Sequence, residues 1–358
     1  MTRVRVLVVE DSVTVRRHLC AVLGSDPDIE VVAEAGDGKQ AIHLCQTVRP
    51  DVVTMDMMLP VMSGLGATEY IMAHCPTPIL IVSASMNRGE VFKTYEALAA
   101  GAIEVLEKAN GEEPAGEWER RLAATVKLVS RVRTVTHVRA RLGALGQSHR
   151  ASKPWPVMHS PGRRQGQVVA IGASTGGPGA ILEILRALPR DFALPLLLVL
   201  HINEPFAAAF AEWLDGQTAF RVFYAVDGQL VSATCGRVTM APPDSHLVVR
   251  SGRLRLTREP ERHSCRPSVD VLFESLATEY GSSATACLLT GMGRDGAAGL
   301  LDIRRAGGLT IAQDETTSVV YGMPREAVLL GAVERVLPLG EIASSLAAVA
   351  DSARSDEG

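Results

Sequence analysis

The chain has 358 residues, of which 47% are hydrophobic, and a formal net charge of −4 at pH 7. This length exceeds the usual size of a single hydrophobic core, so we expect two domains. The slight excess of acidic residues argues against a protein that binds nucleic acid or anionic membranes, because both depend on clustered positive charge. Six cysteines without paired spacing, and no apolar segment of membrane-spanning length, predict a reduced, cytoplasmic protein that does not insert into a membrane.

Short apolar runs alternate with amphipathic stretches through the first 109 residues. Strands are predicted at 4–9, 29–35, 51–55, 78–84 and 102–107. Helices are predicted near 13–24, 38–48, 64–73 and 88–99. Such alternation is typical of a parallel sheet covered by helices on both faces, which predicts a doubly wound domain.

A helix is then predicted from Trp118 to Leu142, and a segment rich in Gly, Ser and Pro follows it. Between Arg120 and Arg164 the sequence contains Lys and Arg but neither Asp nor Glu. We interpret this stretch as a solvated linker, with docking to an acidic partner as the alternative.

The strand and helix alternation resumes after the linker. Strands are predicted at 167–172, 195–201, 220–224 and 284–290, helices from 177 and 205 and at 296–306, and a β-rich insert at 236–257. The predicted fold class is therefore α/β, with two doubly wound parallel-sheet domains and a β-rich insert in the second. The predicted boundaries are 1–112 for the first domain, 113–165 for the helix and linker, and 166–352 for the second domain.

Acidic side chains follow the strands of the first domain. Glu10 and Asp11 come directly after the first strand and Asp56 after the third, while Ser83 ends the fourth and Lys108 follows the fifth. In an open parallel sheet these positions meet at one edge. Three converging carboxylates repel one another unless a cation neutralises them, and oxygen ligands favour Mg²⁺. Lys108 is placed to stabilise an added phosphoryl group.

Four segments, "VLVVEDS", "TMDMMLPVMSG", "PILIVSA" and "AIEVLEKA", resemble the marker segments of a response-regulator receiver domain. The resemblance implies that Asp56 is the phosphoacceptor, that Glu10 and Asp11 hold Mg²⁺ with it, and that a histidine kinase is the phosphodonor. It further implies that Ser83 is the switch hydroxyl and that Lys108 contacts the phosphoryl group. Glu10 departs from the pattern, which has Asp more often at this position.

A candidate nucleophile lies at the start of the second domain. The stretch "GASTG" fits the G-x-S-x-G turn that exposes a serine at a helix N-terminus, although the same glycines also suit a dinucleotide-binding turn. His201 and Asp295 also follow predicted strands, so the three groups are expected to meet at one edge of the sheet. Ser174 then acts as nucleophile, His201 as base and Asp295 as the group that orients the imidazole. The backbone amides of Thr175 and Met292 are the expected oxyanion donors.

The second domain resembles the catalytic domain of the chemotaxis protein-glutamate methylesterases. The resemblance is carried by "AIGASTGGP", "APPDSHL", "RPSVDVLFESLA", "LLTGMGRDGAAGL" and "VVYGMPREA". It implies hydrolysis of glutamyl methyl esters on a chemoreceptor to glutamate and methanol, with deamidation of receptor glutamines as a further reaction and no cofactor at the esterase site. The segment "LHINEPFAAAFAEWL" around His201 departs from the family pattern.

Four further residues near these motifs are candidates to line the cleft and are not assigned a catalytic role: Arg266, Ser268, Asp270 and His246. For Asp270, a helix cap is an equally good interpretation. In the unphosphorylated state the first domain is expected to cover the edge that carries Ser174, and phosphorylation of Asp56 to release it.

Three other functions compete with the esterase. An adaptor with an inactive site is disfavoured by the intact Ser174, His201 and Asp295. A nucleotide-dependent oxidoreductase lacks the acidic residue expected about 20 positions after the glycine-rich turn. A transcriptional effector lacks a basic recognition helix after residue 167.

Overall fold

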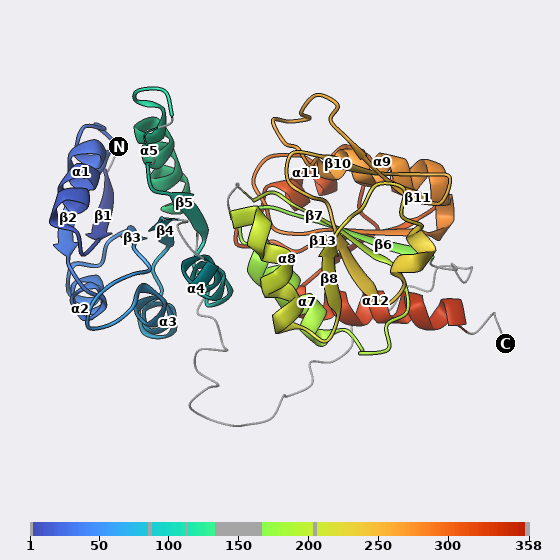
Figure 1. Cartoon of the computed structure of the whole chain (residues 1–358), viewed down its shortest axis with the longest axis horizontal. Helices are drawn as coiled ribbons and strands as arrows, with labels where there is room; N and C mark the ends of the chain where they lie inside the picture. The colour runs from blue at the N-terminus through green and yellow to red at the C-terminus, as the bar shows by residue number, and fades with distance from the viewer. Residues whose placement is uncertain are drawn as a thin grey trace.

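The computed structural model describes residues 3–84, 88–109, 111, 113–132, 167–202 and 206–354. Two α/β domains lie side by side, and helix α4 of the first faces helices α7 and α8 of the second (Figure 1). The predicted fold class is confirmed.

The first domain is a five-stranded parallel sheet with strand order β2-β1-β3-β4-β5. Its strands are β1 (Val4–Val9), β2 (Ile29–Ala35), β3 (Val52–Met55), β4 (Ile79–Ser83) and β5 (Glu104–Glu107). Its helices are α1 (Val13–Gly24), α2 (Gly38–Val48), α3 (Gly64–His74), α4 (Arg88–Ala99) and α5 (Glu117–Val129). Side-chain oxygens of Ser12, Asp37 and Ser63 accept hydrogen bonds from the first turns of α1, α2 and α3, so each helix begins directly after a strand-end loop.

Helix α5 belongs to the core of the first domain. Trp118, Leu122 and Val126 on one face of α5 are buried against Val6 and Leu19 of the sheet and α1. The sequence pattern alone groups this helix with the linker. The prediction that it continues to Leu142 was wrong at its end, because α5 stops at Val129 and the chain leaves the helix. Residues 133–166 lie outside the described residues.

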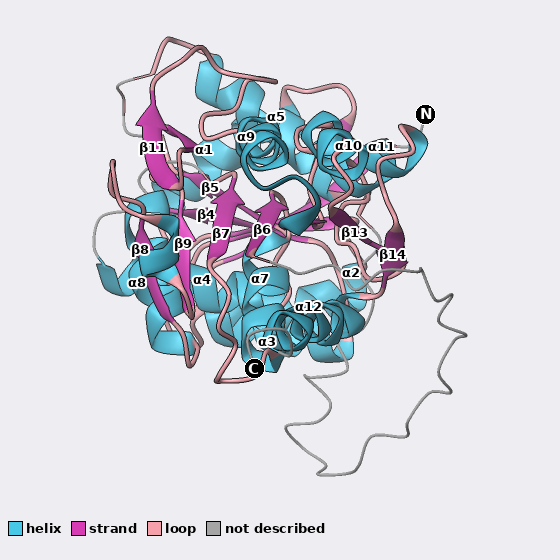
Figure 2. Cartoon of the chain, turned by 90° about the vertical axis from the view of Figure 1, so that its right-hand side faces the viewer, coloured by secondary structure: helices cyan, strands magenta, loops and turns pink. Residues whose placement is uncertain are grey.

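The second domain is a seven-stranded sheet with strand order β14-β13-β12-β6-β7-β9-β8, parallel throughout. Its strands are β6 (Val168–Ala173), β7 (Leu196–Leu200), β8 (Arg221–Tyr224), β9 (Arg237–Met240), β12 (Ala284–Leu288), β13 (Leu309–Gln313) and β14 (Arg335–Leu337). Its helices are α7 (Gly177–Ala187), α8 (Phe206–Gln217), α9 (Val269–Tyr280), α10 (Ala297–Arg305), α11 (Met323–Leu329) and α12 (Leu339–Arg354). Helices α9, α10 and α11 cover one face of this sheet, and α7 and α12 cover the other (Figure 2).

The β-rich insert divides into two parts. Its first strand, β9, joins the main sheet between β7 and β8, while β10 (His246–Arg250) and β11 (Arg253–Thr257) form a separate antiparallel hairpin. Leu247 and Leu254 of this hairpin are buried in the same core as α9. The insert therefore extends the sheet and also supports the helix that borders the candidate active site.

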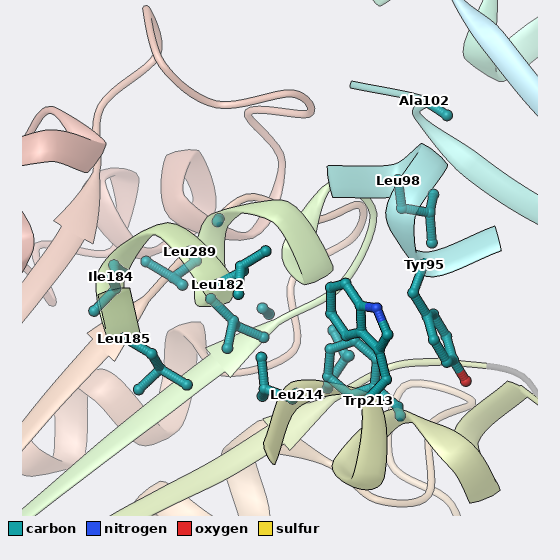
Figure 3. Close-up of a cluster of buried hydrophobic side chains, with 14 of the residues drawn as sticks. Tyr95, Leu98, Ala102, Leu182, Ile184, Leu185, Trp213, Leu214 and Leu289 are labelled. Carbon is teal, nitrogen blue, oxygen red and sulfur yellow. The ribbon is translucent and has the colours of Figure 1, made fainter. Parts of the chain in front are cut away.

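The two domains share one continuous hydrophobic core. Tyr95 and Leu98 of α4 belong to the same buried cluster as Ile181 of α7 and Phe210 of α8. Figure 3 shows Tyr95 beside Trp213 in this cluster, and their ring centroids are 5.3 Å apart. Strand β5 is an edge strand of the first sheet, and α4 is the helix that precedes it in the chain. The second domain therefore packs against this edge of the first domain.

Candidate active site

Ser174 and His201 occupy neighbouring strand ends, as their positions in the sequence predict. Strands β6 and β7 pair in parallel up to Ala173 and Leu200, and the next residues along are Ser174 and His201. The backbone N–H of His201 donates to the carbonyl of Ala173 at 3.0 Å. Gly176, two residues after the serine, adopts φ of 77°, a conformation that glycine tolerates, and turns the chain from β6 into α7.

Asp295 reaches the same edge from the loop after β12. Its Oδ2 lies 2.8 Å from Nε2 of His201, and the residue is 2% exposed. The same loop passes close to the serine, because a Cβ on Gly291 would lie 2.8 Å from Cβ of Ser174. Three segments that are far apart in the sequence therefore converge at one site.

The N-terminus of α9 holds Asp295 in place. Ser268 Oγ donates to Oδ1 at 2.7 Å, the Val269 N–H to Oδ2 at 2.7 Å, and the Asp270 N–H to Oδ1 at 3.1 Å. The positive end of the helix dipole also favours a carboxylate here. Glycine at 172 permits this arrangement, because a Cβ there would lie 2.2 Å from Cγ1 of Val269.

This support for Asp295 goes beyond what the sequence predicts. Ser268, and not Asp270, is the N-cap of α9. Asp270 is fully buried, where its Oδ1 accepts from the N–H of Gly299 at 2.7 Å, which ties α9 to the start of α10. His246 Nδ1 accepts from the N–H of Ser268 at 3.1 Å. The "RPSVD" and "APPDSHL" motifs contained the sequence signals for this support.

The electrostatics of the pair follow from burial and hydrogen bonding. Burial opposes ionisation of Asp295, but hydrogen bonds from His201, Ser268 and Val269 and the charge of His201 lower its pKa below the ordinary value. Burial also acts to lower the pKa of His201, yet hydrogen bonds with Asp295 and Cys265 raise it to about 9. The site thus favours an imidazolium next to a carboxylate.

The free ring nitrogen of His201 contacts a cysteine that has no predicted role. Nδ1 lies 3.7 Å from Sγ of Cys265, on the side of the ring opposite Asp295. Within the described parts of the chain, no hydrogen bond joins Ser174 Oγ to His201. Because Nε2 is engaged by Asp295, Nδ1 is the ring nitrogen that remains for a proton acceptor role.

The expected oxyanion donors differ in their surroundings. Thr175 is buried and Met292 is half exposed. In the part of the chain that the structure describes, neither backbone N–H donates to another group. Neither amide is therefore engaged by an acceptor in that part of the chain, and the Thr175 amide is in the more enclosed surroundings.

The acidic cluster of the first domain also assembles as expected. Oxygen atoms of Glu10, Asp11 and Asp56 all lie within 4.8 Å of one another. Lys108 Nζ lies 2.8 Å from Oε2 of Glu10 and 3.1 Å from Oδ1 of Asp56. Burial raises the pKa of Glu10, and the charge of Asp56 adds to this, whereas Lys108 opposes it. Ser83 is buried at the end of β4, where its hydroxyl donates to the carbonyl of Ala84.

A polar contact crosses between the domains beside the candidate nucleophile. The hydroxyl of Thr175 donates to Oε2 of Glu104, on β5, at 2.7 Å. On α4, the hydroxyl of Tyr95 donates to the carbonyl of Phe206, the first residue of α8. The first domain therefore contacts the residue directly after Ser174.

Comparison with known proteins identifies the family. Residues 169–346 match the CheB methylesterase family, and residues 6–114 match the response regulator receiver domain. A protein-glutamate methylesterase/protein-glutamine glutaminase of Nitrosospira multiformis is 43% identical over 96% of this chain and 96% of its own length. The chain belongs to the CheB methylesterase family. A second relative of the same name, from Anaeromyxobacter dehalogenans, is 42% identical over 96% of both chains.

One solved CheB methylesterase structure is also similar to this chain. The crystal structure of the Thermotoga maritima CheB methylesterase catalytic domain is 36% identical, covers 51% of this chain and 98% of that chain, and gives a TM-score of 0.49. As a member of the CheB methylesterase family, this chain joins a receiver domain to an esterase domain. Among the helices that the structure describes, none has the length and apolar character needed to cross a membrane.

Proposed function

We propose that this protein is a phosphorylation-regulated protein-glutamate methylesterase that hydrolyses glutamyl methyl esters on chemoreceptors, with Ser174, His201 and Asp295 as its catalytic residues. The observation that carries the proposal is the hydrogen bond between His201 and Asp295, at the sheet edge that also carries Ser174. The names of the relatives support the substrate class and add a second reaction, deamidation of receptor glutamines. In both reactions the acyl group of a receptor side chain passes first to the serine and then to water.

Acyl transfer from the ester proceeds in two steps. Ser174 Oγ attacks the ester carbonyl carbon while His201 Nδ1 accepts the hydroxyl proton, and the proton then passes to the departing methoxide, which leaves as methanol. Water attacks the acyl-serine in the second step and releases glutamate and the free serine. Asp295 holds Nε2–H throughout, so the base is Nδ1. The amides of Thr175 and Met292 stabilise the negative charge on the carbonyl oxygen.

Chemistry at the first domain begins with phosphoryl transfer from a histidine kinase to Asp56. The three oxygen donors of Glu10, Asp11 and Asp56 fit Mg²⁺, which prefers carboxylate and water ligands. When bound, Mg²⁺ neutralises the charge that develops on the phosphoryl oxygens. Lys108, already paired with Asp56, turns its ammonium to the new phosphoryl group, and Ser83 supplies a hydroxyl to it.

Regulation follows from the interface. Helix α4 and strand β5 follow the switch residue Ser83 and precede Lys108, and both contact the second domain through Tyr95 and Glu104. A phosphoryl group that draws Ser83 and Lys108 inwards shifts these elements and weakens the contact. The unphosphorylated first domain therefore acts as a lid that holds Thr175, the residue directly after the nucleophile.

The test is a methanol-release assay on methylated receptor, with and without a small-molecule phosphoryl donor. We expect Ser174→Ala to abolish methanol release, and Asp56→Ala to retain basal release but lose stimulation by the donor. Methanol release by Ser174→Ala at the wild-type rate would refute the catalytic assignment. Removal of residues 1–150 is expected to raise basal activity, and an unchanged turnover would refute the lid.

A further inference from the structure

Cys265 lies against the ring nitrogen that the esterase reaction uses. Its Sγ is 3.7 Å from Nδ1 of His201, while Nε2 of the same ring is engaged by Asp295 at 2.8 Å. With the Nε2 proton directed to the carboxylate, the lone pair of neutral His201 is on Nδ1 and faces the thiol. Sulfur and imidazole nitrogen are the donors that zinc prefers in proteins.

The carboxylate of Asp295 is an outer partner of this pair and not a ligand. Its Oδ1 accepts from Ser268 Oγ and the Asp270 N–H, and its Oδ2 accepts from His201 Nε2 and the Val269 N–H. Both oxygens are thus already used. A carboxylate that holds the far nitrogen of a histidine is the usual outer support of a zinc-bound imidazole, because it fixes the ring and raises its basicity.

The spacing of the two donor atoms fits one shared ion. A tetrahedral zinc ion at about 2.3 Å from sulfur and about 2.0 Å from nitrogen holds these atoms roughly 3.5 Å apart. The observed separation is 3.7 Å. We propose that Cys265 Sγ and His201 Nδ1 form a binding site for Zn²⁺, and that the bound ion inhibits the esterase. Water completes the coordination, and on binding the Cys265 thiol and Nδ1 of the His201 imidazolium each release a proton to solvent.

The thiol is accessible and held in position. Cys265 is half-buried and lines a pocket of about 510 Å³ together with Met292, Arg294 and Glu326. Its backbone exchanges two hydrogen bonds with Arg262, at 2.9 and 3.2 Å, which close the tight turn that precedes it. The pocket gives an ion a route to the sulfur, and the turn fixes the direction of the side chain.

Inhibition follows from the use of Nδ1, and this part of the inference rests on the proposed function. A metal-bound Nδ1 has no lone pair with which to accept the proton of Ser174, so the serine stays a neutral hydroxyl. Mg²⁺ has little affinity for a thiolate and an imidazole, so the cation of the first domain does not compete at this site. The proposed site therefore responds to a different metal from the one expected at Asp56.

The binding experiment uses the full-length protein, reduced, with excess Mg²⁺ to occupy the carboxylates of the first domain. Co²⁺ replaces Zn²⁺ as the spectroscopic probe, because a cobalt–thiolate bond absorbs strongly, and bound zinc is counted after dialysis. We expect Cys265→Ser to lose one equivalent of bound metal and the corresponding cobalt–thiolate absorption. Cys235→Ser, which removes an exposed cysteine of the same domain, serves as the control and is expected to behave as wild type.

Two further variants separate this inference from the esterase assignment. Ser174→Ala is expected to bind metal like wild type, so the site can be tested even if methanol release proves not to be the reaction. His201→Gln is expected to weaken binding at least about tenfold while the thiol remains. Equal metal content and absorption in wild type and Cys265→Ser would overturn the proposal.

The activity arm measures methanol release against added Zn²⁺. Wild type and Cys235→Ser are expected to lose activity over the concentration range in which they bind the ion. Cys265→Ser is expected to need at least about tenfold more Zn²⁺ for the same fractional inhibition. Identical inhibition curves for wild type and Cys265→Ser would overturn the inhibitory role.

Discussion

Thr175 and Glu104 belong to different domains, yet the threonine hydroxyl donates to the Glu104 carboxylate at 2.7 Å, one residue after Ser174. Burial raises the pKa of Glu104 above its ordinary value, and the hydrogen bond from Thr175 opposes this only in part. Glu104 therefore contributes a contact to the interface between the domains, and its pKa depends on whether that interface is formed.

Removal of the Glu104 carboxyl is expected to release the first domain. Glu104→Ala deletes the hydrogen bond to Thr175, and a net contribution of about 1 kcal/mol predicts a roughly fivefold rise in basal methanol release without phosphorylation. Glu104→Gln retains an acceptor and is expected to stay near the wild-type rate at about pH 5, below the range in which the two proteins are expected to diverge. Glu30→Gln, on the exposed part of β2, is the control. A basal rate for Glu104→Ala equal to that of wild type would show that this contact does not hold the domains together.

The same residue predicts a dependence of the closed state on pH. The pKa of Glu104 is raised in the closed interface and returns towards its ordinary value, about 4.3, when the domains separate. The closed form therefore binds the proton more tightly, and its stability falls as the pH rises above the ordinary value. We expect the ratio of wild-type to Glu104→Gln basal activity to increase from about pH 5 to about pH 8. Taking the ratio cancels the effect of His201 titration on activity, because that effect is common to both proteins. A ratio that does not change with pH would show that protonation of Glu104 is not coupled to closure of the domains.

His201, the proposed catalytic base, predicts a second pH dependence. His201 accepts a proton only when neutral, and its pKa is about 9, so kcat/KM is expected to rise with pH up to that region. Cys265 is one of the groups that raise this pKa, so Cys265→Ala is expected to move the rise to lower pH. The profiles are measured with saturating phosphoryl donor to keep the domains open. Superimposable profiles for the two proteins would mean that the thiol does not act on the base.

Ser268 is expected to matter for both stability and turnover. Ser268→Ala removes the N-cap of α9, which costs about 1 kcal/mol of unfolding free energy. It also removes a hydrogen bond to the charged Asp295, and we expect kcat to fall about tenfold or more. Urea unfolding and methanol release measure the two effects. Ser268→Thr keeps the hydroxyl and should restore much of both, and Ser344→Ala, which deletes an exposed hydroxyl on α12, should change neither.

The sequence alone was sufficient for the alternation of strands and helices and for the strand-end positions of Glu10, Asp56, His201 and Asp295. The strand-end positions could be predicted because parallel strands bring their carboxyl ends to one edge of the sheet, so that position along the chain predicts position in space. The roles of the individual residues at that edge stay predictions. The end of the helix after Trp118 was predicted wrongly, because α5 ends at Val129. Its apolar face packs against the sheet and α1 of the first domain, a contact that the sequence pattern does not reveal.

Only the tertiary structure decided which atoms meet. It assigned Nε2 of His201 to Asp295 and Nδ1 to Cys265, placed the start of α9 around the Asp295 carboxylate, and joined Thr175 to Glu104. These contacts link residues that are 25 to 94 positions apart. They depend on side-chain rotamers and on the packing of one element against another, which a pattern along a single chain does not contain.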